Sequence, residues 1–303
     1  MKRVHMPSVE HNEVVKFMTS GSRRGGGADP IGSARRRLDR QGALFSIPDN
    51  VAVEPFTVAD RDAEWLRPAE VVEGRHLLYL HGGAYVAGSL NSHRSLAARL
   101  ANAMQATAVH LDYRLAPEHP SPAALEDATA LFRFLVGSGV DPSTVIVAGD
   151  SAGGGLALAL TLRLQELGEA TPGALVLLSP WLDLTMTSPE STELQEFDPM
   201  LDAATLRESA ILYAGDDLKH QLVSPLNGDF SALCPALVFA SSSEILVGDT
   251  RTFVARATSV GAQVTVHEVD GLIHVWPFVD GLPETTAVME EVAHFVHAHF
   301  GPS

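Results

Sequence analysis

Short apolar runs alternate with longer amphipathic stretches along most of this 303-residue chain. Seven of the runs have the length and aliphatic character of buried β-strands. They are residues 51–58, 76–80, 107–113, 144–149, 174–179, 236–241 and 263–269. The stretches between them predict helices near residues 92–103, 121–136, 152–168, 249–260 and 284–299. Apolar strands that alternate with helices predict an α/β fold, in which a mostly parallel sheet has helices on both faces.

Two segments depart from this alternation. Residues 1–45 are polar and predict two short helices on either side of the glycine-rich sequence at 21–27. Residues 183–225 are rich in Thr, Ser, Pro and Glu and predict one helix near 203–214. We expect an N-terminal helical segment (1–45) and a catalytic domain (46–303) with an insertion at about 183–225. Both segments are expected over the same end of the sheet.

Composition and charge exclude several classes of function. The 37 acidic residues outnumber the 21 basic ones, which gives a net charge of −16 that repels nucleic acid and anionic membranes. The lone cysteine, Cys234, excludes an internal disulfide and a thiolate metal site. No apolar run approaches the roughly 18 residues of a membrane span, and the N-terminus lacks the apolar core of a signal peptide. We therefore expect a cytoplasmic protein.

The strongest local motif is GDSAGGG at residues 149–155. It follows a predicted strand and opens a predicted helix, which is the setting of the G-x-S-x-G nucleophile turn. Ser151 would occupy a strained turn, and Gly149 and Gly153 would remove Cβ atoms that collide there. A two-barrel serine protease can carry a similar Gly-Asp-Ser, but no long helix follows it there. A phosphate-binding junction between strand and helix is the other alternative. Neither of its glycine patterns, G-x-x-x-x-G-K-[ST] and G-x-G-x-x-G, is present at this turn.

A second glycine-rich loop, HGGAYVAGS at residues 81–89, directly follows the predicted strand 76–80. An enzyme that transfers acyl groups needs backbone N–H donors about 2.7–3.1 Å from the developing oxyanion. We expect that oxyanion hole at Gly82, Gly83 and Ala84, with the N–H groups of Gly83 and Ala84 as donors beside that of Ala152. An ordinary His-Gly-Gly turn is the alternative for this loop taken alone.

The remaining catalytic groups are expected after Ser151, in the order acid and then histidine. His274 lies in the sequence DGLIHVW, just after the predicted strand 263–269. Glu244 follows the predicted strand 236–241 and is the favoured acid. Asp249 is its rival, although its place before the helix near 250–260 also suits a helix cap. No pattern of histidines and carboxylates such as HExxH indicates a metal.

These motifs together resemble the hormone-sensitive-lipase-like family of α/β-hydrolases, the bacterial family IV esterases. The matching segments are residues 81–89, 112–128, 149–154, 179–185, 197–201, 224–230 and 271–276. The resemblance implies the α/β-hydrolase fold with an eight-stranded, mostly parallel sheet and a helical cap. It also implies hydrolysis of short-chain carboxylic esters by a serine hydrolase without a cofactor. The family often dimerises through a C-terminal edge strand and helix, so a homodimer is a further expectation.

Three positions depart from the family pattern: Ala84 replaces a third glycine, Glu244 stands where Asp is more usual, and Gly248 replaces an acidic residue. None of these changes removes a catalytic group. Three aromatic residues that follow strands or catalytic loops are candidates to line the substrate cleft, with core packing as an equal alternative. They are Tyr85, Trp181 and Trp276.

The same catalytic groups leave other functions open. Hydrolysis of amides, carbamates or lactones would use the same nucleophile and oxyanion hole. A catalytically silent binding protein is a different class, and the plant gibberellin receptor resembles this family but has lost its catalytic histidine. The joint presence of Ser151, Glu244 and His274 argues against that class.

Overall fold

The computed structural model describes residues 7–19 and 29–301, so the glycine-rich sequence at 21–27 lies outside the described residues. Eight strands form one sheet in the order β1-β2-β4-β3-β5-β6-β7-β8. The strands are β1 (Val51–Val58), β2 (Arg61–Pro68), β3 (His76–Leu80), β4 (Thr107–Leu111), β5 (Val145–Asp150), β6 (Ala174–Leu178), β7 (Ala236–Ser241) and β8 (Val264–Val269). Strands β1, β2 and β4 pair antiparallel, and the rest of the sheet is parallel. This arrangement confirms the predicted α/β sheet.

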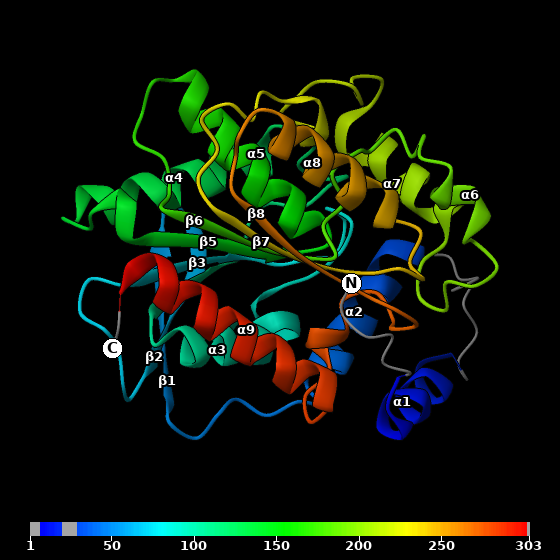
Figure 1. Cartoon of the computed structure of the whole chain (residues 1–303), viewed down its shortest axis with the longest axis horizontal. Helices are drawn as coiled ribbons and strands as arrows, with labels where there is room; N and C mark the ends of the chain where they lie inside the picture. The colour runs from blue at the N-terminus through cyan, green and yellow to red at the C-terminus, as the bar shows by residue number, and fades with distance from the viewer. Residues whose placement is uncertain (1–6, 20–28, 302–303) are drawn as a thin grey trace.

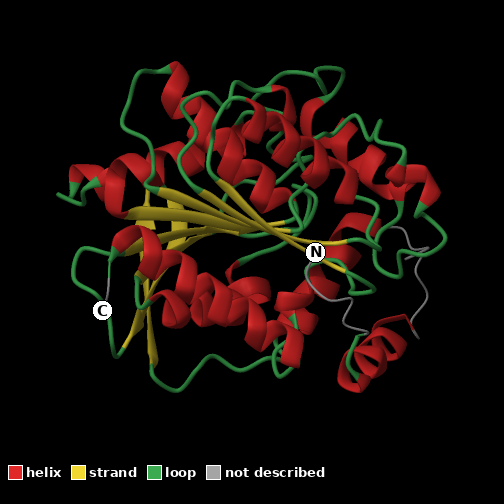
Figure 2. Cartoon of the chain, viewed as in Figure 1, coloured by secondary structure: helices red, strands yellow, loops and turns green. Residues whose placement is uncertain are grey.

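Helices cover both faces of the sheet, as the alternating pattern predicted (Figures 1 and 2). One face carries α3 (Leu90–Met104) and α9 (Pro283–Phe300), and the other carries α4 (Ala123–Gly137), α5 (Ala152–Glu166) and α8 (Val247–Ser259). The buried side chains form two clusters, one on each side of the sheet. Helix α5 is buried along most of its length, which explains why its sequence is apolar nearly all round.

Strand β2 is the one strand that the hydrophobic pattern did not predict. Its sequence RDAEWLRP mixes charged and apolar residues, and its partners come from β1 and β4. Ala59 and Asp60 both have positive φ angles, 48° and 60°, as a two-residue type I′ hairpin turn requires. The turn brings β2 back along β1, where Ala63 and Leu66 are buried.

Four helices lie at the carboxyl ends of the parallel strands, on the right of Figure 1. They are α1 (Val9–Thr19), α2 (Pro30–Gly42), α6 (Glu190–Glu193) and α7 (Ala203–Ala214), and we call them the edge helices. Arg35 of α2 donates hydrogen bonds to the carbonyls of Val86, in the loop after β3, and Ala116, in the loop after β4. These bonds attach the N-terminal segment to the same end of the sheet where α6 and α7 of the insertion lie (Figure 1).

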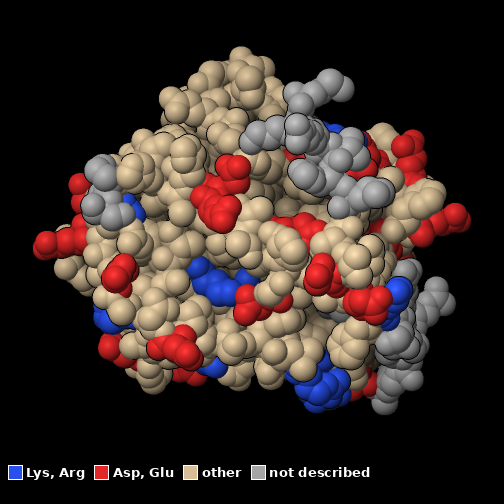
Figure 3. Space-filling model, turned by 60° about the horizontal axis from the view of Figure 1, so that its bottom comes forward, with Lys and Arg blue, Asp and Glu red and all other residues tan. Residues whose placement is uncertain are grey.

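Acidic side chains are spread over the face shown in Figure 3, and the basic ones form small separate groups. This distribution fits the net charge of −16. Within the part of the chain that the structure describes, none of the helices is both long and apolar enough to cross a membrane.

Candidate active site

Ser151 occupies the turn between β5 and α5 and has a backbone that few residues adopt, with φ 52° and ψ −122°. Residues other than glycine are strained in this conformation, and such strained residues are concentrated at functional sites. A Cβ atom at Gly149 would collide with the carbonyl oxygen of Gly153, and one at Gly153 would collide with that of Leu80. The glycines therefore let β5, the turn and α5 approach closely, as the sequence predicted.

Asp150 joins the nucleophile turn to the loop after β3. Its Oδ1 atom accepts hydrogen bonds from the Tyr79 hydroxyl at 2.5 Å and from the Gly82 N–H at 2.9 Å. Its Oδ2 atom lies 3.4 Å from Nε2 of His93. Burial alone would raise the pKa of Asp150, but the attraction of His93 and the bonds from His93 and Tyr79 hold it below the ordinary value. A buried carboxylate thus fixes one glycine-rich loop against the other.

The loop after β3 is folded tightly through three consecutive residues with positive φ angles. Gly83 has φ 118°, Ala84 has 54° and Tyr85 has 62°. Among the described residues, the N–H groups of Gly83, Ala84 and Ala152 have no hydrogen-bond acceptor. The N–H of Gly82 differs because it is bound to Asp150. The three N–H groups that the sequence predicts as oxyanion donors are therefore available, whereas Gly82 belongs to the loop without offering a free donor.

His274 and Glu244 meet although 30 residues separate them. Nδ1 of His274 lies 2.7 Å from Oε2 of Glu244, and both side chains are buried. Burial would lower the pKa of His274, but the Glu244 carboxylate outweighs it, so that the pKa of His274 is raised above its ordinary value. Nε2 of His274 is buried and has no hydrogen-bond partner among the described residues. This geometry orients one ring nitrogen toward the acid and leaves the other available for proton transfer.

Asp249 has a different environment from Glu244. It lies in the first turn of α8, which begins at Val247, so it is not the residue that caps this helix. Its Oδ2 atom instead accepts the N–H groups of Leu182 at 3.0 Å and Asp183 at 2.9 Å. Burial raises the pKa of Asp249 to about 8. Asp249 therefore fixes the loop after β6, and the structure pairs His274 with Glu244.

Asp198, in the insertion, binds the backbone next to Glu244, and no local pattern in the sequence indicated this role. It is fully buried, and its Oδ1 atom accepts the N–H groups of Met200 and Leu201 at 2.8 and 2.9 Å. Its Oδ2 atom accepts the N–H of Ile245 at 2.9 Å, directly after Glu244. The only signal in the sequence was the FDPML segment in the family resemblance, which gave no partner for the aspartate.

Gly248 stands where the family carries an acidic residue, and side chains of the insertion fill the space that such a residue would need. A Cβ atom there would meet the side chains of Ser188 and Glu190, which is the first residue of α6. The glycine therefore leaves room for the insertion to pack against the start of α8.

The loop that carries His274 is bound to the ends of β6 and β7. Three serine hydroxyls form hydrogen bonds with its backbone. Ser243 accepts from the N–H of Gly271 at 3.1 Å, Ser241 donates to the carbonyl of Leu272 at 2.6 Å, and Ser179 accepts from the N–H of Val275 at 3.1 Å. A fourth bond comes from α1, where Nε2 of His11 accepts the N–H of Ile273 at 3.0 Å.

The end of β6 also connects this loop to the nucleophile turn. The Ser151 N–H donates to the carbonyl of Leu178, and the Ser151 carbonyl accepts from the N–H of Trp181, each at 2.9 Å. Between these two partners lies Ser179, whose hydroxyl holds Val275 beside His274. The turn and the histidine loop are thus bound to the same short segment after β6.

The three aromatic candidates for the substrate cleft are all buried. Trp276, in the 3-10 helix η3 (Trp276–Phe278), packs with Phe239 in the cluster beneath α3 and α9, so the structure assigns it to the core.

Tyr85 stacks on Tyr213 of α7, with ring centroids 3.9 Å apart. Tyr85 and Trp181 lie against α5 beside Gly155, where a Cβ atom would meet the Trp181 carbonyl and approach the Tyr85 hydroxyl. Both stay candidates because they flank the start of the nucleophile helix.

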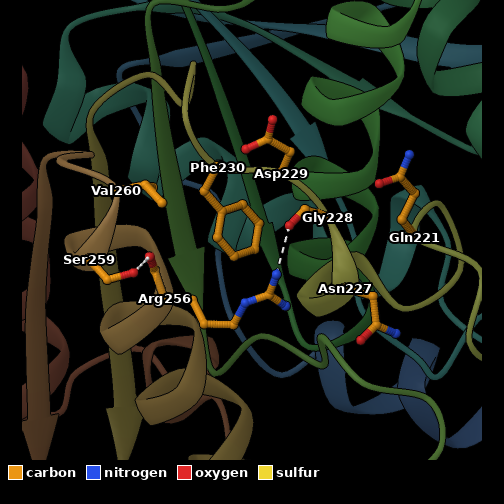
Figure 4. A pocket seen from close by; sticks show the side chains of 8 residues that line it. All are labelled: Gln221, Asn227, Gly228, Asp229, Phe230, Arg256, Ser259 and Val260. Carbon is orange, nitrogen blue, oxygen red and sulfur yellow. Dashed lines mark hydrogen bonds between the residues drawn. The ribbon is translucent and has the colours of Figure 1, made fainter.

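A hollow of about 340 Å³ lies away from these groups, beside the 3-10 helix η2 (Pro225–Asn227) and the end of α8 (Figure 4). Arg256 spans it, with donated bonds to the carbonyls of Leu226 and Gly228 and a place over the Phe230 ring. Those bonds give the guanidinium a structural role between α8 and η2. Among the described residues, no group of three or more His, Cys, Asp or Glu side chains is arranged to hold a metal ion.

The sequence and the structure of this chain were compared with those of known proteins. The family model described as the alpha/beta hydrolase fold matches residues 77–278. The chain belongs to this family. An acetyl-hydrolase of Streptomyces hygroscopicus is 40% identical over 280 residues, which cover 92% of each chain. An esterase of Acinetobacter venetianus is 35% identical over 85% of this chain and 86% of its own.

Solved structures support the same placement of this α/β-hydrolase. A crystal structure of an esterase from the bacterial hormone-sensitive lipase family has a TM-score of 0.93 and 33% identity, covering 98% of this chain and all of its own. The crystal structure of EstE5 soaked with p-nitrophenyl butyrate has a TM-score of 0.92 and 35% identity, covering 97% of this chain and all of its own. These likenesses confirm the resemblance to hormone-sensitive-lipase-like esterases.

Proposed function

We propose that this α/β-hydrolase is a serine carboxylesterase in which Ser151, His274 and Glu244 form the catalytic triad. The bond between His274 and Glu244 is the observation that carries the proposal, because it fixes the histidine tautomer that a base for Ser151 requires. The chain is a carboxylic ester hydrolase, as its esterase and acetyl-hydrolase relatives are named. The soak of EstE5 with p-nitrophenyl butyrate favours short acyl esters as substrates.

The reaction begins when Oγ of Ser151 attacks the ester carbonyl carbon and its proton passes to Nε2 of His274. The carbonyl oxygen becomes an oxyanion, which the N–H groups of Gly83, Ala84 and Ala152 stabilise. The Glu244 carboxylate stabilises the imidazolium without taking its proton. His274 then gives the proton to the leaving alcohol, and an acyl group remains on Ser151. Water, deprotonated by His274, releases the acid by the same steps.

The edge helices would form the cap over this site and so set the size of the acyl group. Tyr85 belongs to the oxyanion loop and stacks on Tyr213 of α7, so it would join the cap to the catalytic groups. Tyr85 and Trp181 are the proposed lining residues. The division into residues 1–45 and 46–303, a cytoplasmic location and a homodimer stay predictions.

Kinetics with p-nitrophenyl butyrate test the proposal. Ser151→Ala should lower kcat by roughly 10⁴-fold or more, because the nucleophile is lost while the binding groups remain. The exposed Ser138→Ala, at the end of α4, is the matched control and should keep the full rate. Activity of Ser151→Ala within a factor of ten of the wild type would refute the triad.

A further inference from the structure

His11 of α1 reaches across 262 residues of sequence to the loop that carries His274. Its Nε2 atom accepts the N–H of Ile273 at 3.0 Å, and that amide belongs to the residue directly before His274. The other three bonds to this loop come from serines at or just after the ends of β6 and β7. The bond from His11 is thus the one of these four that an edge helix provides.

The start of α1 is fixed in the position that this bond needs. The N–H and the hydroxyl of Ser8 donate to the two carboxylate oxygens of Glu284, in the first turn of α9, at 2.7 and 3.0 Å. The Ser8 hydroxyl in turn accepts the N–H of His11 at 3.0 Å. Pro7 lies against Gly271, where it would meet any added Cβ atom. These contacts hold α1 against both α9 and the histidine loop.

The imidazole of His11 can accept this bond only while it is neutral. Its side chain is buried, with 1% of the residue exposed. Burial lowers the pKa of His11, and this effect outweighs the opposing influences of the Glu284 carboxylate and the Asn12 side chain, which raise it. The ring therefore stays neutral at neutral pH, and Nε2 keeps a lone pair toward Ile273.

We propose that His11 is a positioning residue for the general base: it fixes the backbone beside His274 from the N-terminal helix. This inference rests on the proposed function, because it assigns His11 a role through His274. Without the acceptor, the N–H of Ile273 would lose its buried partner, and the loop would shift to find another. A displacement of about 1 Å at a catalytic group can cost about 10²-fold in rate.

The role predicts a specific dependence on the leaving group. An alkoxide such as ethoxide leaves only when His274 protonates it, whereas p-nitrophenolate is stable enough to leave without a proton. A misplaced His274 should therefore slow the hydrolysis of ethyl butyrate more than that of p-nitrophenyl butyrate. A general loss of folded protein would reduce both rates by the same factor.

The test compares His11→Leu and His11→Gln with the wild type on these two esters. Leu removes the acceptor, whereas Gln can present an amide oxygen near the former position of Nε2. We expect His11→Leu to lower kcat/KM, which reports the step in which the alcohol leaves, about 10-fold more for ethyl butyrate than for p-nitrophenyl butyrate. His11→Gln should restore both rates to within about threefold of the wild type. Glu10→Gln, at an exposed position on α1, is the matched control and should leave both rates unchanged.

His11→Asn serves as a second variant should His11→Leu fail to fold, because its amide is polar but too short to reach Ile273. It should reproduce the selective loss on ethyl butyrate. Equal losses on both esters, or a His11→Gln variant as impaired as His11→Asn, would overturn the role of His11. Failure of the proposed function would appear separately, as full activity of Ser151→Ala in the same assays.

Discussion

Nδ1 of His274 lies 2.7 Å from Oε2 of Glu244, and this bond joins the loop after β8 to the loop after β7. Asp249 lies only five positions further along the chain but is bound to Leu182 and Asp183 instead. Two carboxylates in neighbouring positions thus have separate tasks. One orients the imidazole, and the other fixes the backbone after β6.

Substitution of the two carboxylates should separate these tasks. Glu244→Gln should lower kcat on p-nitrophenyl butyrate by about 10²–10⁴-fold, because the amide cannot stabilise the imidazolium. Asp249→Asn should stay within about threefold of the wild type, because its amide oxygen can accept the same two N–H groups. Steady-state kinetics of both variants provide the measurement. Comparable losses in the two would reopen the identity of the acid.

The raised pKa of His274 predicts the acid side of the pH profile. His274 acts as a base only when neutral, so kcat/KM should fall as the pH falls through a midpoint above about 6.5, the ordinary value for histidine. In Glu244→Gln the attraction is lost while burial remains, so the midpoint should move to lower pH. Profiles of kcat/KM between about pH 5 and 9 test this. An unchanged midpoint in Glu244→Gln would show that another group sets it.

The backbone of Ser151 predicts a cost in stability. Glycine adopts positive φ angles without strain, whereas alanine has the same Cβ atom as serine. Ser151→Gly should therefore be about 1 kcal/mol more stable than Ser151→Ala, with both inactive. Urea unfolding of the two variants gives the difference. Equal stabilities would mean that the turn stores no strain at this residue.

Asp249 predicts a dependence of stability on pH. Its pKa is about 8 in the folded protein, well above the ordinary value of an unfolded aspartate, so the folded state holds the proton more tightly. Its contribution to stability is therefore present at low pH and is lost as the pH rises toward 8. Asp249→Asn does not titrate at this position. Between about pH 5 and 8 the unfolding free energy of the wild type should therefore fall relative to that of Asp249→Asn. Parallel stability curves would contradict the raised pKa.

The nucleophile turn could be predicted because its determinants are local. Gly149, Ser151 and Gly153 lie within five consecutive residues, and the strand before them and the helix after them have clear apolar patterns. Glu244, the proposed acid, was expected near His274 from its place after a strand, since the carboxyl ends of parallel strands meet at one edge of the sheet. The same reasoning located His274 after β8.

Other features depend on contacts that no local pattern shows. Strand β2 is formed by pairing with β1 and β4, which overrides a sequence that mixes charged and apolar residues. Asp198 and His11 act on residues 47 and 262 positions away, so only the fold brings them to Ile245 and Ile273. The N–H of Gly82 donates to Asp150, 68 residues away, and this contact too is visible only in the fold.

The most direct test of the central claim is stoichiometric labelling by a fluorophosphonate, located by mass spectrometry. A serine activated by His274 should take one phosphonyl group per chain, and the label should map to Ser151. Loss of hydrolysis of p-nitrophenyl butyrate should follow the extent of labelling. A label on another residue, or full activity in the completely labelled protein, would contradict the proposed role of Ser151.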